Sequence, residues 1–226
     1  MSASGVRARV RAEMTEEIKA VARRHLATDG ANLSLRAVAR DMGMASSAVY
    51  RYFASRDELL TALIIEAYDA VGAAADRAAE GHADPLDRWL ALAHAVREWA
   101  LADPHQWALI YGSPVPGYQA PQDTVGPATR VIVLIGHLVH DAYAAGRIAD
   151  REPITGRYAE ELAAVGERFT PGAPPRLVGA AMAAFIQLCG AISAELFGQL
   201  NNTVDEDRRG FFEFQMRGAA ALAGLT

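Results

Sequence analysis

The chain has 226 residues, a formal net charge of −5 and 51% hydrophobic residues. Its length suits one large domain or two small ones with hydrophobic cores, and its composition excludes an intrinsically disordered chain. Residues 1–14 hold no apolar segment, so they predict no secretory signal. Cys189 is the only cysteine, which excludes an internal disulfide and a multi-cysteine metal site. We therefore expect a cytoplasmic protein.

The longest apolar stretch, residues 177–198, is long enough to cross a membrane. It carries Gln187 and Glu195, however, and it is rich in alanine and glycine. This composition favours a buried helix in a soluble bundle over a membrane span.

Positive charge gathers at the start of the chain. Residues 1–56 hold ten basic and five acidic residues, whereas the remainder holds 12 basic and 22 acidic residues. A basic N-terminal part followed by an acidic remainder suggests that residues 1–56 alone bind a polyanion. A chance excess of solvated arginines is the alternative, and charge by itself leaves both interpretations open.

The first three predicted elements are helices, in chain order. The first spans about residues 12–28 and stops at Asp29-Gly30, where glycine favours a helix end. Ser34 can cap a second helix, which Gly43 ends after about two turns. A third short helix follows over residues 46–53.

The remaining pattern is also helical, and no stretch alternates in the manner of a strand. Ser55 and Glu58 match a capping box that opens a long fourth helix, which links the two halves of the chain. Residues 112–121 and 171–175 are rich in proline and glycine and predict breaks. Further helices are expected over these ranges: 86–101, a short one after Asp103-Pro104, 124–145, 154–168, 176–199 and 205–223. The prediction is an all-α fold with about nine or ten helices.

Residues 34–53 have the layout of a helix-turn-helix. Ala39 supplies the small side chain that two steeply crossing helices need, and Gly43 tolerates the positive φ of a tight turn. Val38, Met42, Met44 and Val49 are placed to bury apolar groups together. The same pattern occurs in ordinary helical hairpins, so the outward face of the second helix must distinguish a DNA-binding motif from such a hairpin.

That outward face carries small residues first and long polar ones afterwards. Small, hydrogen-bonding residues at the start of the helix suit entry into a major groove, and the later ones can reach phosphates or base edges. The predicted DNA contacts are Arg36, Ser46, Ser47, Ala48, Tyr50, Arg51, Tyr52 and Arg56. For Tyr50 and Tyr52, contact with the first helix of the motif is the alternative.

Residues 14–60 resemble the DNA-binding domain of the tetracycline-repressor (TetR) family. The resemblance rests on SLRAVARDMGM, on SSAVYRYFASRDELL and on the long helix that follows. It implies that Tyr50 and Arg56 touch the DNA backbone and that Arg36 faces the duplex. The family usually has Gly, Thr or Pro near the head of the recognition helix, where this chain has Ala45-Ser46-Ser47-Ala48, so the operator sequence stays open.

The resemblance further implies two domains, a DNA-binding domain over residues 1–56 and an effector-binding and dimerisation domain over 57–226. The expected partners are a palindromic double-stranded operator, a small apolar or amphipathic effector and a second copy of the chain. The expected function is that of a ligand-responsive repressor, with no enzymatic activity, cofactor, metal or membrane partner. A helical small-molecule-binding protein that does not bind DNA is the alternative.

The stretch 105–130 resembles a TetR subgroup with a loop of the form G-S-P-x-P-G-Y-x-A-P and a Trp…His-Gly element in its penultimate helix. Here residues 185–190 read FIQLCG, so Phe185 replaces the tryptophan and Cys189 the histidine. Any role of that histidine therefore does not carry over. Cys189 itself is either a buried small hydrophobe or a reactive sensor.

The last two helices are the expected dimer surface, because small residues permit close contact between helices. The residues concerned are Gly179, Ala180, Ala183, Ala184, Gly190, Ala191 and Ala194. Contact of this face within one subunit is the alternative.

An effector pocket should be apolar with a few polar groups. The candidate ligand contacts are Trp89, Trp99, Trp107, Tyr111, His137, Phe185 and Gln187, with His94 and His140 as further polar groups. For the aromatic residues, a place in the core is the alternative. His137 and His140 share a helix face and could hold a metal, but no partner ligand is evident.

Ahead of the first predicted helix, Arg7, Arg9 and Arg11 alternate in a segment with no core pattern. Such an arm either follows or enters a minor groove, or it is a disordered, solvated tail.

Overall fold

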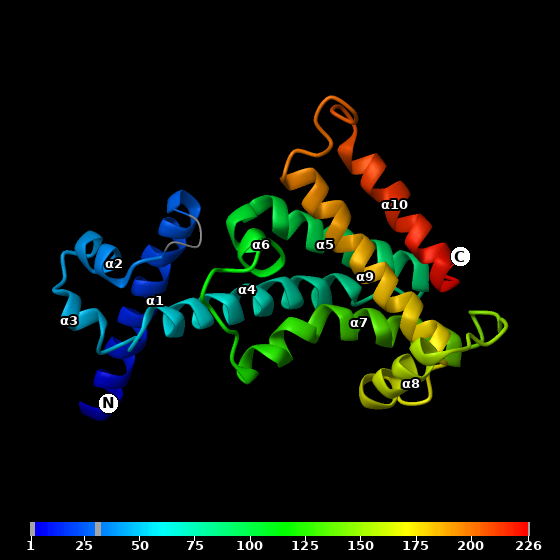
Figure 1. The fold of residues 1–226 in the computed structure, drawn as a ribbon, viewed down its shortest axis with the longest axis horizontal. Coiled ribbons are helices and arrows are strands. Elements are labelled where there is room, and N and C mark those ends of the chain that lie inside the picture. Colours follow the sequence, from blue (N-terminus) through cyan, green and yellow to red (C-terminus); the bar gives the residue numbers. More distant parts are fainter. Residues whose placement is uncertain (1–2, 30–32, 226) are drawn as a thin grey trace. The chain divides into compact units, whose positions relative to one another are not determined.

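A computed structural model describes residues 3–29 and 33–225, and within these residues it contains ten α-helices and no strand (Figure 1). The predicted all-α fold with nine or ten helices is confirmed. The chain forms two compact units: unit 1 comprises Met1–Ala67 and His105–Val125, and unit 2 comprises Tyr68–Pro104 and Gly126–Thr226. Unit 1 therefore extends past residue 56 to Ala67 and includes a second segment of the chain, and the predicted division into a DNA-binding and an effector-binding domain stays a prediction.

Unit 1 is built from α1 (Ala3–Asp29), α2 (Leu35–Asp41), α3 (Ser46–Val49), the first part of α4 (Arg56–Ala79), α6 (Pro104–Tyr111) and the short 3₁₀ helix η1 (Gln122–Thr124). Its core includes residues of α1, α2, α3 and α4 that are fully shielded from solvent. Ile18, Val38, Ala39, Val49 and Leu59 each have 0% exposure. Because Val49 is buried in this core, the opposite side of α3 faces solvent.

The first helix begins nine residues before the predicted start at residue 12. Val6 and Val10 are exposed by 44% and 53%, so this extension has no buried stripe that sequence periodicity could reveal. Once a helix is nucleated, each further residue adds one hydrogen bond at little cost, and the Arg9–Glu13 ion pair of 2.7 Å supports the exposed turn. The predicted end at Asp29 agrees with the structure, while Gly30 lies outside the described residues.

The turn between α2 and α3 follows the prediction. The hydroxyl of Ser34 accepts the amide of Ala37 as the cap of α2, and Gly43 has φ +65°. Only glycine adopts that conformation without strain. Ala39 is fully buried where α2 meets α3, as its small side chain predicts.

The start of α4 departs from the predicted capping box in one bond. The Ser55 hydroxyl accepts the amide of Glu58 at 3.1 Å, as expected. The Glu58 carboxylate, however, accepts the amide of Ala54 rather than that of Ser55. Further along α4, Glu66 pairs with Lys19 and with Arg23 of α1, so ion pairs join α1 to α4. Although burial opposes it, contact with Glu16 and Glu66 raises the pKa of Lys19 above its ordinary value.

Unit 2 contains the end of α4, α5 (Pro85–Ala102), α7 (Val125–Ala144), α8 (Arg157–Phe169), α9 (Pro175–Leu196) and α10 (Arg208–Ala223). Figure 1 shows α9 and α10 side by side, and α9 also contacts α5 and α8. The predicted loop over residues 112–121, which belongs to unit 1, contains no helix. Helix positions in unit 2 lie close to the predicted ones.

Buried polar groups fix the arrangement of α5, α9 and α10. Arg97 of α5 forms two hydrogen bonds of 2.7 and 2.6 Å with Glu195 of α9, and both side chains are less than 10% exposed. The Trp89 indole N–H donates to the carbonyl of Met216 at 2.8 Å. These bonds join three helices in one core.

Within the described residues, α9 has the length and hydropathy of a membrane-crossing helix. The core helix of a soluble protein passes the same test. Because α9 contacts three helices and pairs its buried Glu195 with Arg97, contact within unit 2 accounts for the apolar residues on its buried face.

Candidate DNA interface and effector cavity

The predicted recognition helix is shorter than expected. Its regular part, α3, ends at Val49, and the prediction of a helix to Phe53 is corrected here. The amides of Arg51 and Tyr52 bond to carbonyls three residues back, those of Ala48 and Val49, which is the tighter 3₁₀ pattern. The chain therefore continues in helical turns as far as Phe53, whose amide bonds to Val49 at 3.1 Å.

The outward side of this segment is polar and basic. Arg36 of α2, Ser47 of α3 and Arg51 are exposed, and Tyr50 has 44% exposure. Ser46 and Ala48 are half-buried at the start of α3. Within the described part of the chain, the guanidinium groups of Arg36 and Arg51 have no ion pair or hydrogen bond. Such exposed cations are available to phosphates.

Tyr52 occupies a different environment from Tyr50. It is half-buried against the core of unit 1, and the guanidinium carbon of Arg11 lies 5.1 Å from the centre of its ring. Arg11 also donates a hydrogen bond of 3.1 Å to the carbonyl of Arg51. Tyr52 therefore contacts α1 through Arg11, and contact of either tyrosine with α2 stays a prediction.

Arg56 stands at the first turn of α4. Its Nε donates to the carbonyl of Leu33 at 3.2 Å, and its guanidinium pairs with Asp57 at 3.2 Å. These bonds connect the start of α4 to the segment that precedes α2.

Arg7, Arg9 and Arg11 lie in α1 rather than in an arm. Both interpretations of the sequence, a groove-binding arm and a disordered tail, placed these arginines ahead of the first helix, and that placement is corrected. Contact of these arginines with DNA stays a prediction. The helix places Arg11 beside the recognition segment, whereas Arg9 forms an ion pair with Glu13.

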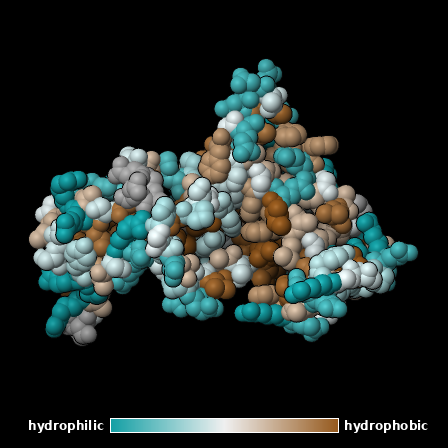
Figure 2. Space-filling model, viewed as in Figure 1, coloured by the Kyte–Doolittle hydropathy of each residue, from teal (hydrophilic) through white to brown (hydrophobic). Residues whose placement is uncertain are grey.

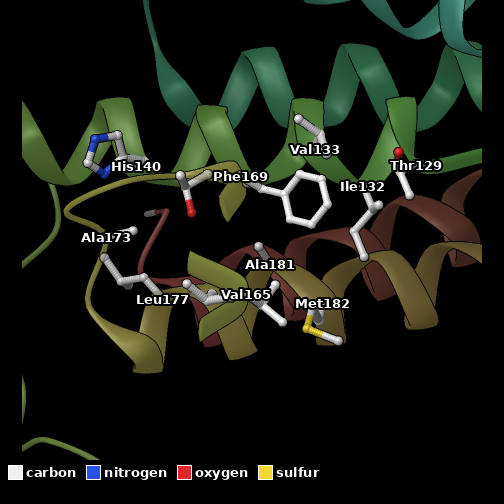
Figure 3. A pocket seen from close by; sticks show the side chains of 13 residues that line it. Thr129, Ile132, Val133, His140, Val165, Phe169, Ala173, Leu177, Ala181 and Met182 are labelled. Carbon is white, nitrogen blue, oxygen red and sulfur yellow. The ribbon is translucent and has the colours of Figure 1, made fainter. Parts of the chain in front are cut away.

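Unit 2 contains a cavity of about 160 Å³ between α7, α8 and α9 (Figure 3). Its wall is almost wholly carbon, from aliphatic side chains and the ring of Phe169. The aliphatic residues include Ile132, Val133, Val165, Leu177, Ala181 and Met182. A cavity of about 150 Å³ with a similar lining holds a benzene molecule, so this one has the size of a small ligand. Figure 2 shows hydrophobic surface gathered over α7 and α9.

None of the seven residues predicted as ligand contacts lines this cavity. Trp89 is buried in the core, and the Gln187 amide donates to the carbonyl of Gln215 at 2.9 Å. Trp107 and Tyr111 belong to unit 1, where their ring centres lie 4.4 Å apart.

The other three predicted ligand contacts lie in unit 2. His137 bonds to the carbonyl of Phe169 at 2.9 Å and lines an open groove beside the cavity, together with Asp76 and Arg130. Trp99 and Phe185 are half-buried. As ligand contacts, all seven residues remain predictions.

The residues that do line the cavity were missed because they look like ordinary core positions. On α7 they recur at 129, 132, 133, 136 and 140, which is the spacing of any inward helix face. Of this set, sequence reasoning proposed His140 alone.

The remaining candidate groups do not form a metal site or a reactive thiol among the described residues. Among the described residues, no cluster of three or more His, Cys, Asp or Glu is placed to hold a metal. Burial raises the pKa of the Cys189 thiol to about 12, which keeps it protonated and a poor nucleophile at neutral pH. Burial, followed by the nearby Arg209, lowers the pKa of His94.

The geometry of unit 1 defines a class: a helix-turn-helix protein that presents exposed basic and hydroxyl groups on α2, on α3 and on the turns that follow α3. Comparison with known proteins gives the family. Residues 18–63 match the family model "Bacterial regulatory proteins, tetR family", and residues 89–219 match "Tetracyclin repressor-like, C-terminal domain".

Full-length relatives agree with these matches. The HTH-type transcriptional regulators Rv1816 of Mycobacterium tuberculosis and Mb1846 of Mycobacterium bovis are each 39% identical over 220 residues, which cover 94% of this chain and 93% of theirs. The crystal structure of SCO4313 is 36% identical with a TM-score of 0.78, covering 94% of this chain and 98% of that one.

The chain belongs to the TetR family. It is a ligand-responsive, DNA-binding transcriptional regulator, as the sequence predicts, and this family is not one of enzymes. The likeness to the Trp…His-Gly subgroup stays a prediction.

Proposed function

We propose that the protein is a homodimeric repressor that binds a two-fold symmetric operator and leaves it when a small molecule occupies unit 2. The observation that carries this proposal is that Arg36, Tyr50 and Arg51 of the helix-turn-helix are all exposed, and that neither arginine has an ion pair with any residue that the structure describes. The residues that we propose to contact DNA are Arg36, Ser46, Ser47, Ala48, Tyr50, Arg51, Tyr52 and Arg56. Its expected location is the cytoplasm, where the operator is.

Exposed apolar residues on α9 and α10 support the dimer. Ile186 and Phe197 at α9, and Phe214 and Leu222 on α10, are 67%, 51%, 72% and 54% exposed. A soluble single chain gains nothing from such side chains in water, whereas a four-helix bundle of α9, α10 and their copies would bury them. The arrangement is isologous, so each side chain contributes twice.

Two glycines on the same helices also support the proposed dimer. A Cβ added at Gly190 or Gly218 would meet no described atom within 4 Å, so contact within the subunit does not require glycine there. Glycine inside a helix costs about 1 kcal/mol relative to alanine, and close approach of a second subunit offsets that cost. By contrast, Ala180, Ala184 and Ala191 are buried within the subunit.

Replacing Ile186 and Phe214 together with glutamate should convert the dimer to monomers of 24.2 kDa. Four carboxylates would be buried in the symmetric interface, which should raise the dimer dissociation constant by roughly a thousandfold or more. Light scattering after size-exclusion chromatography measures the mass. Tyr158→Glu on α8, where the tyrosine is 56% exposed, is the matched control and should remain dimeric. A dimeric double variant would contradict the proposed interface.

The function itself is tested by recovering the DNA fragments that the protein binds across its genome. We expect a shared sequence of two inverted half-sites with centres about 34–36 Å apart, one helical turn of DNA. Because linkage is reciprocal, a molecule that lowers the affinity for this operator must bind the DNA-bound protein less tightly than the free protein. Enriched fragments that share no inverted pair of half-sites would contradict the proposed two-fold symmetric operator.

A further inference from the structure

We infer that the cavity between α7, α8 and α9 binds a small, uncharged, hydrocarbon-like molecule. The inference rests on the proposed function only in taking this cavity as the effector site. It selects the apolar class of effector over the amphipathic one, and it places the ligand away from the seven residues that the sequence suggested.

The size of the cavity sets the size of the ligand. Its volume of about 160 Å³ is close to that of a protein cavity that holds one benzene molecule. Such a space accepts roughly six to eight carbon atoms. It is too small for a peptide side-chain cluster from a partner protein.

The wall of the cavity sets the ligand's polarity. None of the described residues that line it is charged, and almost none of its exposed wall is polar. A charged group moved from water into this space would lose its hydrogen bonds to water, and the lining offers few polar groups in exchange, those of Thr129, His140 and Thr170.

The two polar side chains on α7 stand at opposite ends of the cavity rather than within it (Figure 3). The Thr129 hydroxyl donates to the carbonyl of Gly126 at 3.1 Å. The His140 Nδ1 atom is buried and has no hydrogen-bond partner among the described residues. Since that atom is shielded rather than exposed on the wall, it does not supply the cavity with a polar surface.

The space between these ends is kept open by small residues. Gly136 lies at the middle of the α7 face, and a Cβ there would come within 3.2 Å of the Thr170 methyl group. Opposite, Ala181 of α9 lies near the ring of Phe169 (Figure 3). A larger residue at position 181 would therefore fill the volume that a ligand needs.

Toluene, phenol and benzoate test the inference, because they share one ring and differ in polarity. Calorimetric titration of the full-length protein should detect toluene binding, phenol binding at least about tenfold weaker, and no benzoate binding. Ala181→Leu should weaken toluene binding at least about tenfold and leave the fold intact, since it fills a cavity. Ala164→Leu, at an exposed position of α8, is the matched control and should bind toluene as the native protein does.

The result that overturns the inference is tighter binding of phenol or benzoate than of toluene, or toluene binding that Ala181→Leu leaves unchanged. If Ala181→Leu does not fold, Val165→Phe at the rim replaces it, because Val165 is 38% exposed and tolerates a larger side chain. Absence of toluene binding to the folded native protein would also overturn it.

These titrations contain no DNA, so their outcome is separate from that of the proposed function. Operator binding with failed toluene binding would refute the ligand class alone. Toluene binding that leaves the operator affinity unchanged would sustain the ligand class and refute the cavity as the effector site.

Discussion

Replacing Glu195 with glutamine should lower the free energy of unfolding by about 3 kcal/mol, as expected when one partner of a buried ion pair is removed. The Glu195 and Arg97 side chains are 7% and 9% exposed, and the pair is held by two hydrogen bonds. Glutamine keeps the shape of glutamate but leaves the Arg97 charge without its counter-charge. Urea unfolding, followed by circular dichroism, measures the loss.

Two further variants show whether the isolated charge is the cause. Glu161→Gln removes an ion pair with Arg157 whose side chains are 67% and 90% exposed, and it should change stability by less than about 1 kcal/mol. Arg97→Met combined with Glu195→Leu removes both charges and should recover most of the loss, because no buried charge remains unpaired. Equal effects of Glu195→Gln and Glu161→Gln would refute the argument.

Replacing Tyr50 and Arg51 together with alanine should weaken operator binding by roughly a hundredfold or more. Hydrogen bonds to charged groups contribute about 1.5–3 kcal/mol each, and a dimer presents both side chains twice. Loss of two arginines per dimer should also reduce the slope of log affinity against log salt concentration by about 2. Fluorescence anisotropy over a series of salt concentrations gives both quantities.

Arg24→Ala is the matched control for charge. Arg24 is exposed on α1 and lies thirteen residues beyond Arg11, which is about 20 Å along the helix. Its removal lowers the charge of unit 1 as Arg51→Ala does, but away from the recognition segment. If Arg24→Ala and a single Arg51→Ala variant weakened operator binding equally, a diffuse positive field rather than contact by Arg51 would explain the affinity.

The helix-turn-helix could be predicted because its signals are local. Ser34 caps α2, Gly43 adopts the positive φ of the turn, and Ala39 fits the crossing of two helices. Each of these roles depends on neighbours a few residues away, so spacing along the chain is enough to identify it. The all-α fold and the family followed from the same kind of signal.

The ends of elements were less predictable where no buried stripe marks them. The exposed first turns of α1 look like a tail, since an exposed helix and a tail share the same composition. The recognition helix was predicted too long, because its last residues form 3₁₀ turns whose geometry depends on how Phe53 enters the core. Hydrogen-bond spacing of this kind has no sequence signature.

The sequence by itself determined an all-helical regulator with a basic helix-turn-helix head and apolar terminal helices. Only the tertiary structure decided which large residues face water and where space is left unfilled. Trp89 and Trp107 are predicted ligand contacts and both are fully buried, whereas the cavity lies among mainly apolar residues of α7, α8 and α9. A cavity is the volume that side chains distant in the sequence leave unfilled. This volume depends on the positions of all three helices at once.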